Sequence, residues 1–305
     1  DISSQIRQSC CRMRIRSTGS SVFDIQSSQP LCHMTDRRDL DGFSLNTVRE
    51  KGARFRVVRQ IHSIEEKTDR VEIRTQDGLL TARFLIGADG ANSITRRFVT
   101  KKKFYKKQLA LEADVAVPES ASYDMEFDFS RNNSGYYWIF PKNGHVNIGM
   151  YATDSLERPQ MADLMRFAKD RFKTDRLKAV KGYPICTDGA FFRPDTRRIL
   201  LVGDAAGRAE PLFGEGIYFA LKTGQLAARS VNQFFENPVA VQAGYQQSLG
   251  PMTRDLRLYG LSAAFFYRFP RLSLAMAALP AVNQRFAAGF AAGKPLSKII
   301  FGRLG

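Results

Sequence analysis

The stretch RILLVGDAAGRAEPLFGEGIYFALKTG, residues 198–224, constrains the fold more than any other part of the chain. Its apolar run 199–202 is bounded by charge on one side and by Gly203-Asp204 on the other, as expected of a buried parallel strand. Gly214-Glu215-Gly216 then opens an apolar segment, 217–231, that predicts a helix. Open α/β sheets bind ligands at such an edge, and helix N-termini favour anions, so the stretch predicts a site for an anionic or electron-rich group.

A second stretch, FLIGADGANSITRRF at residues 84–98, repeats this arrangement. An apolar strand again ends at Gly87, and Asp89-Gly90 follows directly. By itself, Ala-Asp-Gly after a strand indicates a β-turn. Because it lies upstream of a matching Gly-Asp segment, the two stretches together form a strong joint signal.

Residues 37–51, RRDLDGFSLNTVREK, predict a helix with apolar residues on one side and Gly52 just past its end. The helix begins with the pattern Arg37-x-x-Leu40-Asp41. A planar guanidinium such as that of Arg37 can lie along a phosphate chain. Arginines before helices are common, so this pattern is weak when taken alone.

Residues 136–141, YYWIFP, are rich in aromatic rings within a predicted strand. Tyr136, Trp138 and Phe140 share one face of that strand because side chains alternate. One interpretation is the aromatic core of an antiparallel sheet. The other is a wide, rigid apolar wall for an alkyl chain that offers no hydrogen bonds. The Gly-Asp stretch in the same chain favours the wall.

The other elements are predicted from alternation, amphipathic spacing and turn residues. We expect a hairpin within 10–35 with a turn at 18–20, strands at 55–64, 71–75 and 79–86 with an Asp77-Gly78 turn, strands at 109–117, 123–129, 136–140 and 146–151 with a turn at 132–135, a helix over 158–176, a strand at 184–192, and a helical tail over 252–305.

The chain is strongly basic, with 46 Lys and Arg against 30 Asp and Glu and a net charge of +16. This charge favours anionic partners. The basic run 101–107, KKKFYKK, is either a solvated loop or a contact for a diphosphate, a lipid headgroup or an anionic membrane. After Asp255 the tail has basic residues between Phe and Leu and no acidic residue, which suits a helix at a membrane surface. Aromatic side chains are grouped in apolar patches, so nucleic acid is a poor fit.

The cysteines and histidines of the chain bear on metal binding and on the cellular compartment. The four cysteines lack metal-ligand spacing, and the three histidines are scattered, so no metal site is predicted. A reduced, cytoplasmic setting is expected, with peripheral contact to a membrane through the tail. We see no signal peptide and no apolar run of transmembrane length.

The motifs resemble those of FAD-dependent oxidoreductases with the p-hydroxybenzoate hydroxylase fold, specifically the geranylgeranyl reductase branch. The resemblance covers most of residues 10–250. It implies FAD as cofactor and the reduction of C=C bonds in a geranylgeranyl or other isoprenoid chain, carried on a diphosphate or a membrane lipid. The electron donor is left open between NADPH and a ferredoxin-like protein. No residue stands out as the proton donor, and Tyr136 is a candidate.

By this resemblance, Asp204 bonds the ribityl chain of FAD, and Asp89 helps to hold the pyrophosphate region. Arg37 lies along the ribityl and phosphate chain, and a backbone contact on the adenine side is transferred by spacing to Ile61. The implied FAD-binding residues are Arg37, Ile61, Asp89, Gly90, Gly203, Asp204, Pro211, Gly214, Gly216 and Ile217, and the implied isoprenoid-binding residues are Tyr136, Trp138, Phe140 and Pro141.

Flavoproteins of this class open with a βαβ unit that carries G-x-G-x-x-G. No such pattern precedes Arg37, and residues 1–36 already fit the hairpin that should follow it. We therefore expect the chain to lack an N-terminal βαβ unit of about 30 residues. Whether the chain retains FAD by itself is left open.

Taken together, these observations predict a mixed α/β protein of the p-hydroxybenzoate hydroxylase fold without its first βαβ unit. The expected parts are a discontinuous FAD-binding domain at 1–105 and 185–250, an antiparallel-sheet substrate domain at 106–184, and a basic helical tail at 251–305. Two alternatives remain. One is a flavin-dependent monooxygenase or halogenase of the same fold, and the other is a non-catalytic, membrane-associated fragment.

Overall fold

The computed structural model describes residues 2–17, 22–100, 107–131, 134–153, 158–187, 189 and 194–302. The structure is mixed α/β and divides into two compact units. Unit 1 comprises residues 1–55, 109–183 and 264–305, and unit 2 comprises residues 56–108 and 184–263. The turn expected at 18–20, residues 132–133, the basic run 101–106 and Arg303 lie outside the described residues.

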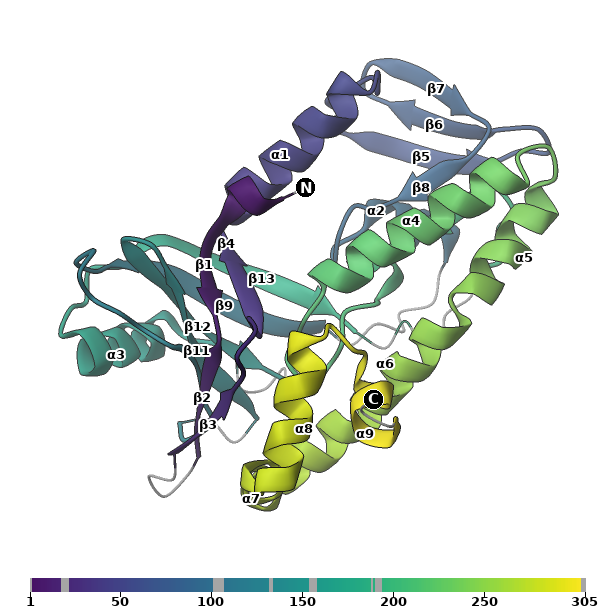
Figure 1. Ribbon diagram of the computed structural model, residues 1–305. Helices are drawn as coiled ribbons and strands as arrows, with labels where there is room; N and C mark the ends of the chain where they lie inside the picture. Colours follow the sequence, from purple (N-terminus) through teal and green to yellow (C-terminus); the bar gives the residue numbers. More distant parts are fainter. Residues whose placement is uncertain are drawn as a thin grey trace. The chain divides into compact units, whose positions relative to one another are not determined.

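Unit 1 is built on a seven-stranded sheet (Figure 1). Its strands and those of a separate pair are β1 (Ile6–Cys10), β2 (Arg12–Arg16), β3 (Val22–Gln26), β4 (Cys32–Thr35), β9 (Lys107–Ala116), β10 (Met125–Asp128), β11 (Gly135–Lys142), β12 (His145–Ala152) and β13 (Lys178–Cys186). The order in the large sheet is β13-β9-β12-β11-β10-β2-β3, and β1 pairs with β4. Neighbours from β9 to β10 are antiparallel, as the alternating sequence predicts, whereas β10 and β2 are parallel.

The helices of unit 1 include one that covers a face of the large sheet. They are η1 (Ser3–Gln5), α1 (Arg37–Glu50), α3 (Met161–Phe172), the end of α6 (Gly250–Arg268), α7 (Pro270–Ala278), α8 (Pro280–Ala291) and α9 (Leu296–Phe301). In α3, Leu164 and Phe167 are fully buried, and the Phe167 ring lies 4.9 Å from that of Tyr137 on β11. Met161 and Met165 of the same helix are exposed. The buried face of α3 therefore closes the core on one side of the sheet.

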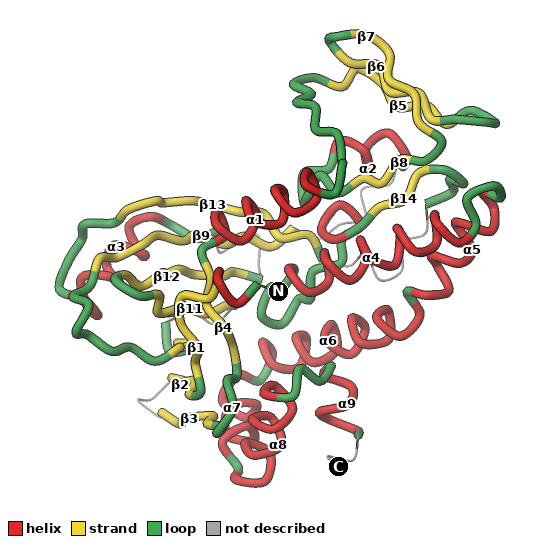
Figure 2. The backbone as a smooth tube through the Cα atoms, turned by 45° about the horizontal axis from the view of Figure 1, so that its top comes forward, coloured by secondary structure: helices red, strands yellow, loops and turns green. Residues whose placement is uncertain are grey.

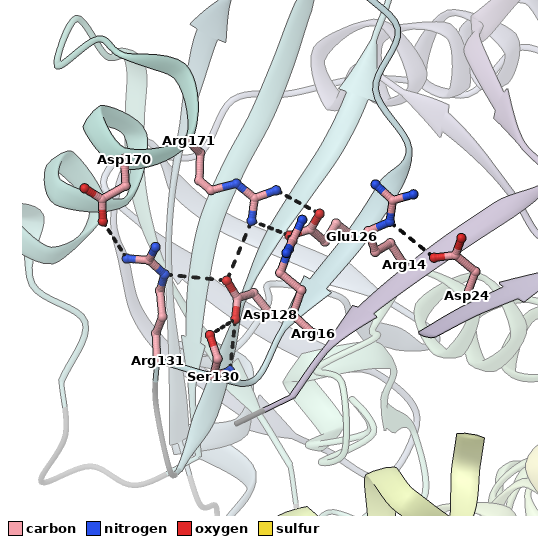
Figure 3. A network of polar contacts seen from close by, with 9 residues as sticks. All are labelled: Arg14, Arg16, Asp24, Glu126, Asp128, Ser130, Arg131, Asp170 and Arg171. Atoms are coloured by element: carbon pink, nitrogen blue, oxygen red, sulfur yellow. Dashed lines mark hydrogen bonds and ion pairs between the residues drawn. The ribbon is translucent and has the colours of Figure 1, made fainter. Parts of the chain in front are cut away.

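A network of charged side chains joins α3 to the strands next to it (Figure 3). Arg171 of α3 donates to both carboxylate oxygens of Glu126 on β10, at 2.6 and 2.9 Å, and Arg16 of β2 donates to the same group at 2.7 Å. Burial opposes ionisation of Glu126, but the two guanidinium groups hold its pKa below the usual value. The ionised carboxylate thus ties α3, β10 and β2 together through charge-assisted bonds.

Unit 2 contains two smaller sheets and the helices beside them (Figure 2). Its elements are β5 (Ile61–Glu66), β6 (Val71–Thr75), β7 (Gly78–Ala82), β8 (Leu85–Gly87), α2 (Ile94–Val99), β14 (Ile199–Leu201), η3 (Gly203–Ala206), α4 (Ile217–Gln233), α5 (Pro238–Ser248) and the start of α6. β5, β6 and β7 form an antiparallel sheet, and β8 pairs with β14 in parallel. Leu200 and Val202 of the β14 segment pack with Phe219 of α4 and Tyr245 of α5 in the core of this unit.

Three predicted strands differ from the observed ones. The strand expected at 55–64 begins only at Ile61. Residues 54–59 include three arginines and are almost all exposed, whereas a half-buried strand needs buried and exposed side chains to alternate. The strand expected at 79–86 is divided into β7 and β8, which lie in different sheets. The strand expected at 184–192 is β13, which ends at Cys186. In the hairpin turn the two loop residues are 76–77, and Gly78 begins β7 with a φ of 116°.

The unit boundaries fall close to two of the expected domain boundaries. The chain passes between units at 108–109 and 183–184, near the expected 105–106 and 184–185. Residues 1–55 and the tail from 264 belong to unit 1, together with the segment expected to bind substrate. Which of these segments binds FAD stays a prediction. Among the described residues, no helix is long and apolar enough to cross a membrane.

Candidate functional site

The two Gly-Asp stretches lie at the same edge of one small sheet in unit 2. β8 and β14 run parallel, and Gly87 is the register partner of Leu201. The strands therefore end side by side, and the loops that carry Asp89 and Asp204 both leave from that edge. Because ligands of parallel sheets bind outside the carboxyl ends of the strands, this edge is the candidate site.

Asp89 caps the helix that follows its own loop. One carboxylate oxygen accepts the Ser93 hydroxyl at 2.6 Å, and the other accepts the backbone N–H groups of Ile94 and Thr95 at 2.7 and 2.9 Å. Burial opposes ionisation of Asp89, but these hydrogen bonds hold its pKa below the usual value. The side chain thus shapes the loop, and Gly90, at a φ of 73°, provides its turn.

Arg96 of α2 joins the two loops, a role that no pattern in the sequence indicates. It is 7% exposed. Its Nη2 donates to the Ala91 carbonyl at 2.6 Å, while Nη1 donates to the carbonyls of Asp204 and Ala205 at 3.0 and 3.1 Å. One buried guanidinium therefore fixes the spacing between the Asp89 loop and the Asp204 segment.

Asp204 lies beside the N-terminus of α4. Its Oδ2 accepts the backbone N–H of Cys186 at 3.3 Å. A Cβ on Gly216, the residue that precedes α4, would lie 3.1 Å from Asp204 Oδ1. Gly203 has a φ of 53°, and a Cβ there would meet Ala220 of α4 at 3.0 Å. Glycine at both positions therefore lets the carboxylate and the helix N-terminus approach each other closely.

Glu210 organises the turn that leads into α4. It is 1% exposed, and it accepts the backbone N–H groups of Leu212, Phe213 and Glu215 at 2.7, 2.7 and 3.0 Å. Burial raises the pKa of Glu210 to about 7, although these N–H groups favour the charged form and the Glu215 carboxylate disfavours it. The buried carboxyl group of Glu210 thus stabilises the turn that carries Pro211 and Gly214 by accepting its backbone N–H groups.

Glu215 occupies part of the N-terminus of α4. Its carboxylate accepts the N–H of Tyr218 at 2.7 Å. The resemblance implies that Gly214, Gly216 and Ile217 contact FAD. The structure shows that a side chain of this same stretch already bonds one amide in the first turn of the helix.

Two predicted cofactor residues belong to other elements than these loops. Ile61 begins β5 and packs with Ile64, Val71 and Ile199 in the core beneath the three-stranded sheet. Arg37 is the first residue of α1 in unit 1, where it pairs with Asp41 at 3.1 Å on the exposed side of the helix.

The predicted isoprenoid-binding residues lie on β11 in unit 1. The rings of Tyr136, Trp138 and Phe140 follow one another on one face, with centroids 6.1 and 5.7 Å apart. Tyr136 and Trp138 are buried. Pro141 falls on the opposite face by alternation and lines a cavity of about 260 Å³ that is otherwise largely polar. The structure therefore groups three of the four predicted residues and separates Pro141 from them.

Neighbouring strands enlarge this aromatic face. Phe127 and Phe129 of the β10 segment and Tyr151 of β12 each lie within 5.5 Å of the Tyr136 ring. The indole of Trp138 lies over Gly149, where a Cβ would be only 2.1 Å from the ring. Trp138 Nε1 donates to Asn147 at 2.8 Å, and Asn147 donates to Asp114 at 3.0 Å. Alternation in the flanking strands could have identified Phe127 and Tyr151, but cross-strand register could not be read from the sequence.

The edge in unit 2 suits a flavin nucleotide. Gly216 leaves open, beside Asp204 Oδ1, the volume that any other side chain would fill. A carboxylate next to glycine-exposed backbone can accept ribityl hydroxyls while the backbone meets a polar ring edge. Among the described residues, no cluster of His, Cys, Asp or Glu has the arrangement of a metal site.

The chain is similar in sequence to known proteins. A digeranylgeranylglycerophospholipid reductase from Methanothermobacter thermautotrophicus is 29% identical over 219 residues, which are 67% of this chain and 56% of that protein. The chain thus spans little more than half the length of this relative.

Solved structures show the same fold at low identity. A geranylgeranyl bacteriochlorophyll reductase-like protein from Thermoplasma acidophilum superposes with a TM-score of 0.74 at 17% identity, covering 98% of this chain and 83% of that one. The flavin-dependent brominase Bmp2 superposes with a TM-score of 0.71 at 18% identity, covering 94% and 77%. A family model described as an FAD binding domain matches residues 11–228. Because this match covers more than half of the chain, the chain belongs to the FAD-binding domain family, and FAD is its cofactor.

Proposed function

We propose that this FAD-dependent oxidoreductase reduces C=C bonds in a geranylgeranyl or related isoprenoid chain, carried on a diphosphate or a membrane lipid. The observation that carries the proposal is the row of buried rings on one face of β11, joined by rings from β10 and β12. A branched alkyl chain needs such a wall, because it offers only apolar surface. The named relative that matches two thirds of the chain is a reductase of this type.

In this proposal, unit 2 holds the flavin half of the cofactor. Asp204 accepts ribityl hydroxyls, the Asp89-Gly90 loop backs the pyrophosphate region, and Gly203 with Gly216 keeps the approach open. Pro211, Gly214 and Ile217 shape the turn at the ring edge, Arg37 bonds the phosphate chain, and Ile61 supports the adenine side. When bound in reduced form, FAD supplies the hydride.

The substrate side of the proposal rests on Tyr136, Trp138 and Phe140. Their rings exclude water and orient the alkene. Tyr136 is the candidate proton donor to the second alkene carbon, because it is the hydroxyl-bearing ring in this row. Pro141 is left out of the wall because its side chain lies on the other face. Trp138 is the only tryptophan of the chain.

The electron donor and the cellular location are the remaining parts of the proposal. The electron donor is NADPH or a ferredoxin-like protein, and the site of action is the cytoplasm or the membrane surface facing it. No disulfide joins the four cysteines, all of which the structure describes, and a reducing compartment is part of the proposal. Nucleic acid is not a partner in this proposal.

The reaction is tested with the chain, dithionite-reduced FAD and a geranylgeranyl phospholipid under argon. The expected product gains two hydrogens per reduced bond by mass spectrometry, and the lipid changes the fluorescence of Trp138. A Trp138→Ala variant, which lacks the reporter tryptophan, should retain less radiolabelled lipid in gel filtration, whereas Tyr183→Ala, which removes an exposed ring, should retain as much as the parent chain. An unchanged lipid mass in the presence of bound, reduced flavin contradicts the proposal.

A monooxygenase or halogenase activity is the second candidate, because the brominase superposes over almost the whole chain. It predicts a product that forms only with oxygen, from an aromatic or other activated substrate. The same incubations in air and under argon distinguish the two reactions. A chain that shows no flavin absorbance after incubation with FAD favours the non-catalytic, membrane-associated alternative.

A further inference from the structure

The C-terminal helices of unit 1 carry a row of exposed apolar side chains. The row consists of Phe265, Phe269, Leu272, Met276 and Leu279, and each of them is between 46% and 54% exposed. Phe265 lies near the end of α6, Leu272 and Met276 lie on α7, and Phe269 and Leu279 flank α7. The rings of Phe265 and Phe269 are 5.5 Å apart across the junction of the two helices. We call these five residues the tail face. An exposed apolar row of this length needs an explanation, because soluble surfaces seldom keep one.

The fold itself does not need the tail face, because the opposite side of the same helices makes the internal contacts. Phe266 packs its ring 5.0 Å from that of Phe129, and Leu274 of α7 is 5% exposed. Asn283 of α8 donates to the Asp24 carbonyl on β3 at 2.9 Å. These helices therefore have two apolar sides, of which one packs in the core of unit 1 and the other is exposed.

The charges around the tail face identify its occupant. No acidic residue follows Asp255, whereas the described part of the tail has six basic ones after it. Arg268 and Arg271 are exposed within the row itself, and Arg268 lies over the Phe269 ring at 5.7 Å. Rings and leucines beside arginines, in a segment whose sequence contains no Asp or Glu, match a lipid surface with anionic headgroups. A second copy would bring the same positive charges face to face, which disfavours self-association.

We propose that the tail face docks this chain on an anionic lipid bilayer, with Phe265, Phe269, Leu272, Met276 and Leu279 in the acyl boundary and Arg268 and Arg271 at the headgroups. The inference rests on the membrane contact in the proposed function and assigns it a surface, but it does not depend on the reductase reaction. Phe266 contacts Phe129, and Phe129 in turn contacts Tyr136 of the proposed isoprenoid wall. Docking here brings a membrane lipid to the protein beside that wall.

The test is sedimentation of the chain with vesicles of phosphatidylglycerol or of phosphatidylcholine, without flavin or reductant. We expect binding to phosphatidylglycerol vesicles that weakens with salt, and little binding to phosphatidylcholine. The double variant Leu272→Glu/Met276→Glu should lose at least about tenfold in affinity, because two carboxylates would enter the boundary. The control Val48→Glu/Leu79→Glu adds the same two charges outside the tail, where these side chains are 48% and 49% exposed, and should bind like the parent chain.

Two further measurements keep the inference falsifiable. Circular dichroism must show that the double variant is folded, and Arg268→Gln should reduce binding without any change in fold. Equal binding by the parent chain and the folded double variant overturns the inference. So does a parent chain that sediments as a dimer and becomes monomeric in the double variant, since the tail face would then be covered by a second copy. Loss of reduction with docking intact would instead count against the proposed reaction alone.

Discussion

Arg96 shows how much of the candidate site depends on one side chain. The residue is charged, and in the sequence it stands next to another arginine in a short helix. In the structure, Arg96 is buried and bonded to carbonyls of both glycine-aspartate loops, whereas Arg97 is exposed. A buried guanidinium is costly unless its donors are paired, so these carbonyls and this arginine depend on each other.

Replacing Arg96 by lysine should therefore destabilise the chain by about 3 kcal/mol, because an ammonium group cannot span the carbonyls on both loops. Urea unfolding measures the change. Arg97→Lys, in the same helix, is the matched control and should stay within about 0.5 kcal/mol of the parent chain. Equal stability of the two variants would show that Arg96 does not hold the loops together.

Glu210 should make stability depend on pH. Its folded pKa of about 7 lies above the value of an exposed glutamate, so the folded state binds the proton more tightly than the unfolded state. Its contribution is therefore complete below about pH 4 and is lost as the pH rises to about 7, with a total of up to about 3 kcal/mol.

The Glu210→Gln variant should remove this slope. Denaturant unfolding of the parent chain and the variant, measured from pH 4.5 to pH 8, gives the difference in their free energies. Glu119→Gln changes an exposed glutamate and should follow the parent chain. Parallel curves for the parent chain and Glu210→Gln would mean that the carboxyl of Glu210 has the same pKa in both states.

At the scale of elements, pairing between β11 and β12 decides the aromatic face. Trp138 is the register partner of Gly149, so its indole lies on a residue without a side chain. The strands were predicted from alternation, and their observed bounds agree with that prediction. Their register was not predicted, and the register is what turns three rings on one strand into a continuous wall across three strands.

Gly149→Ala should displace the indole and break its bond to Asn147, because the new Cβ would lie 2.1 Å from the ring. We expect a loss of about 1–3 kcal/mol from overpacking. The emission of the single tryptophan should also shift. Gly182→Ala on β13 of the same sheet is the control, since its Cβ would meet only ordinary contacts beyond 3.8 Å. Unchanged emission in Gly149→Ala would argue against the observed packing.

At the scale of the whole molecule, cofactor binding should appear as stability. FAD in excess should raise the free energy of unfolding by about 3 kcal/mol at a free concentration roughly one hundred times Kd, since a ligand of the folded state stabilises it by mass action. FMN carries the ring and ribityl chain that unit 2 is proposed to hold, so it should stabilise the chain as well. ADP, which lacks them, should do so much less. Stabilisation by ADP but not by FMN would reverse the proposed assignment.

The sequence determined the types of the main elements, the ends of β8 and β14, and the residues at those ends, because local spacing and glycine chemistry act over a few residues. It also identified the FAD-binding family, which the match over residues 11–228 confirms. It missed Arg96 and Glu210, whose roles depend on partners brought near only by folding. Only the tertiary structure decided which polar groups are buried together and which apolar faces stay exposed. The burial of polar groups and the exposure of apolar faces depend on how strands pair and helices pack. These are contacts between residues far apart in the sequence, so local sequence patterns do not predict them.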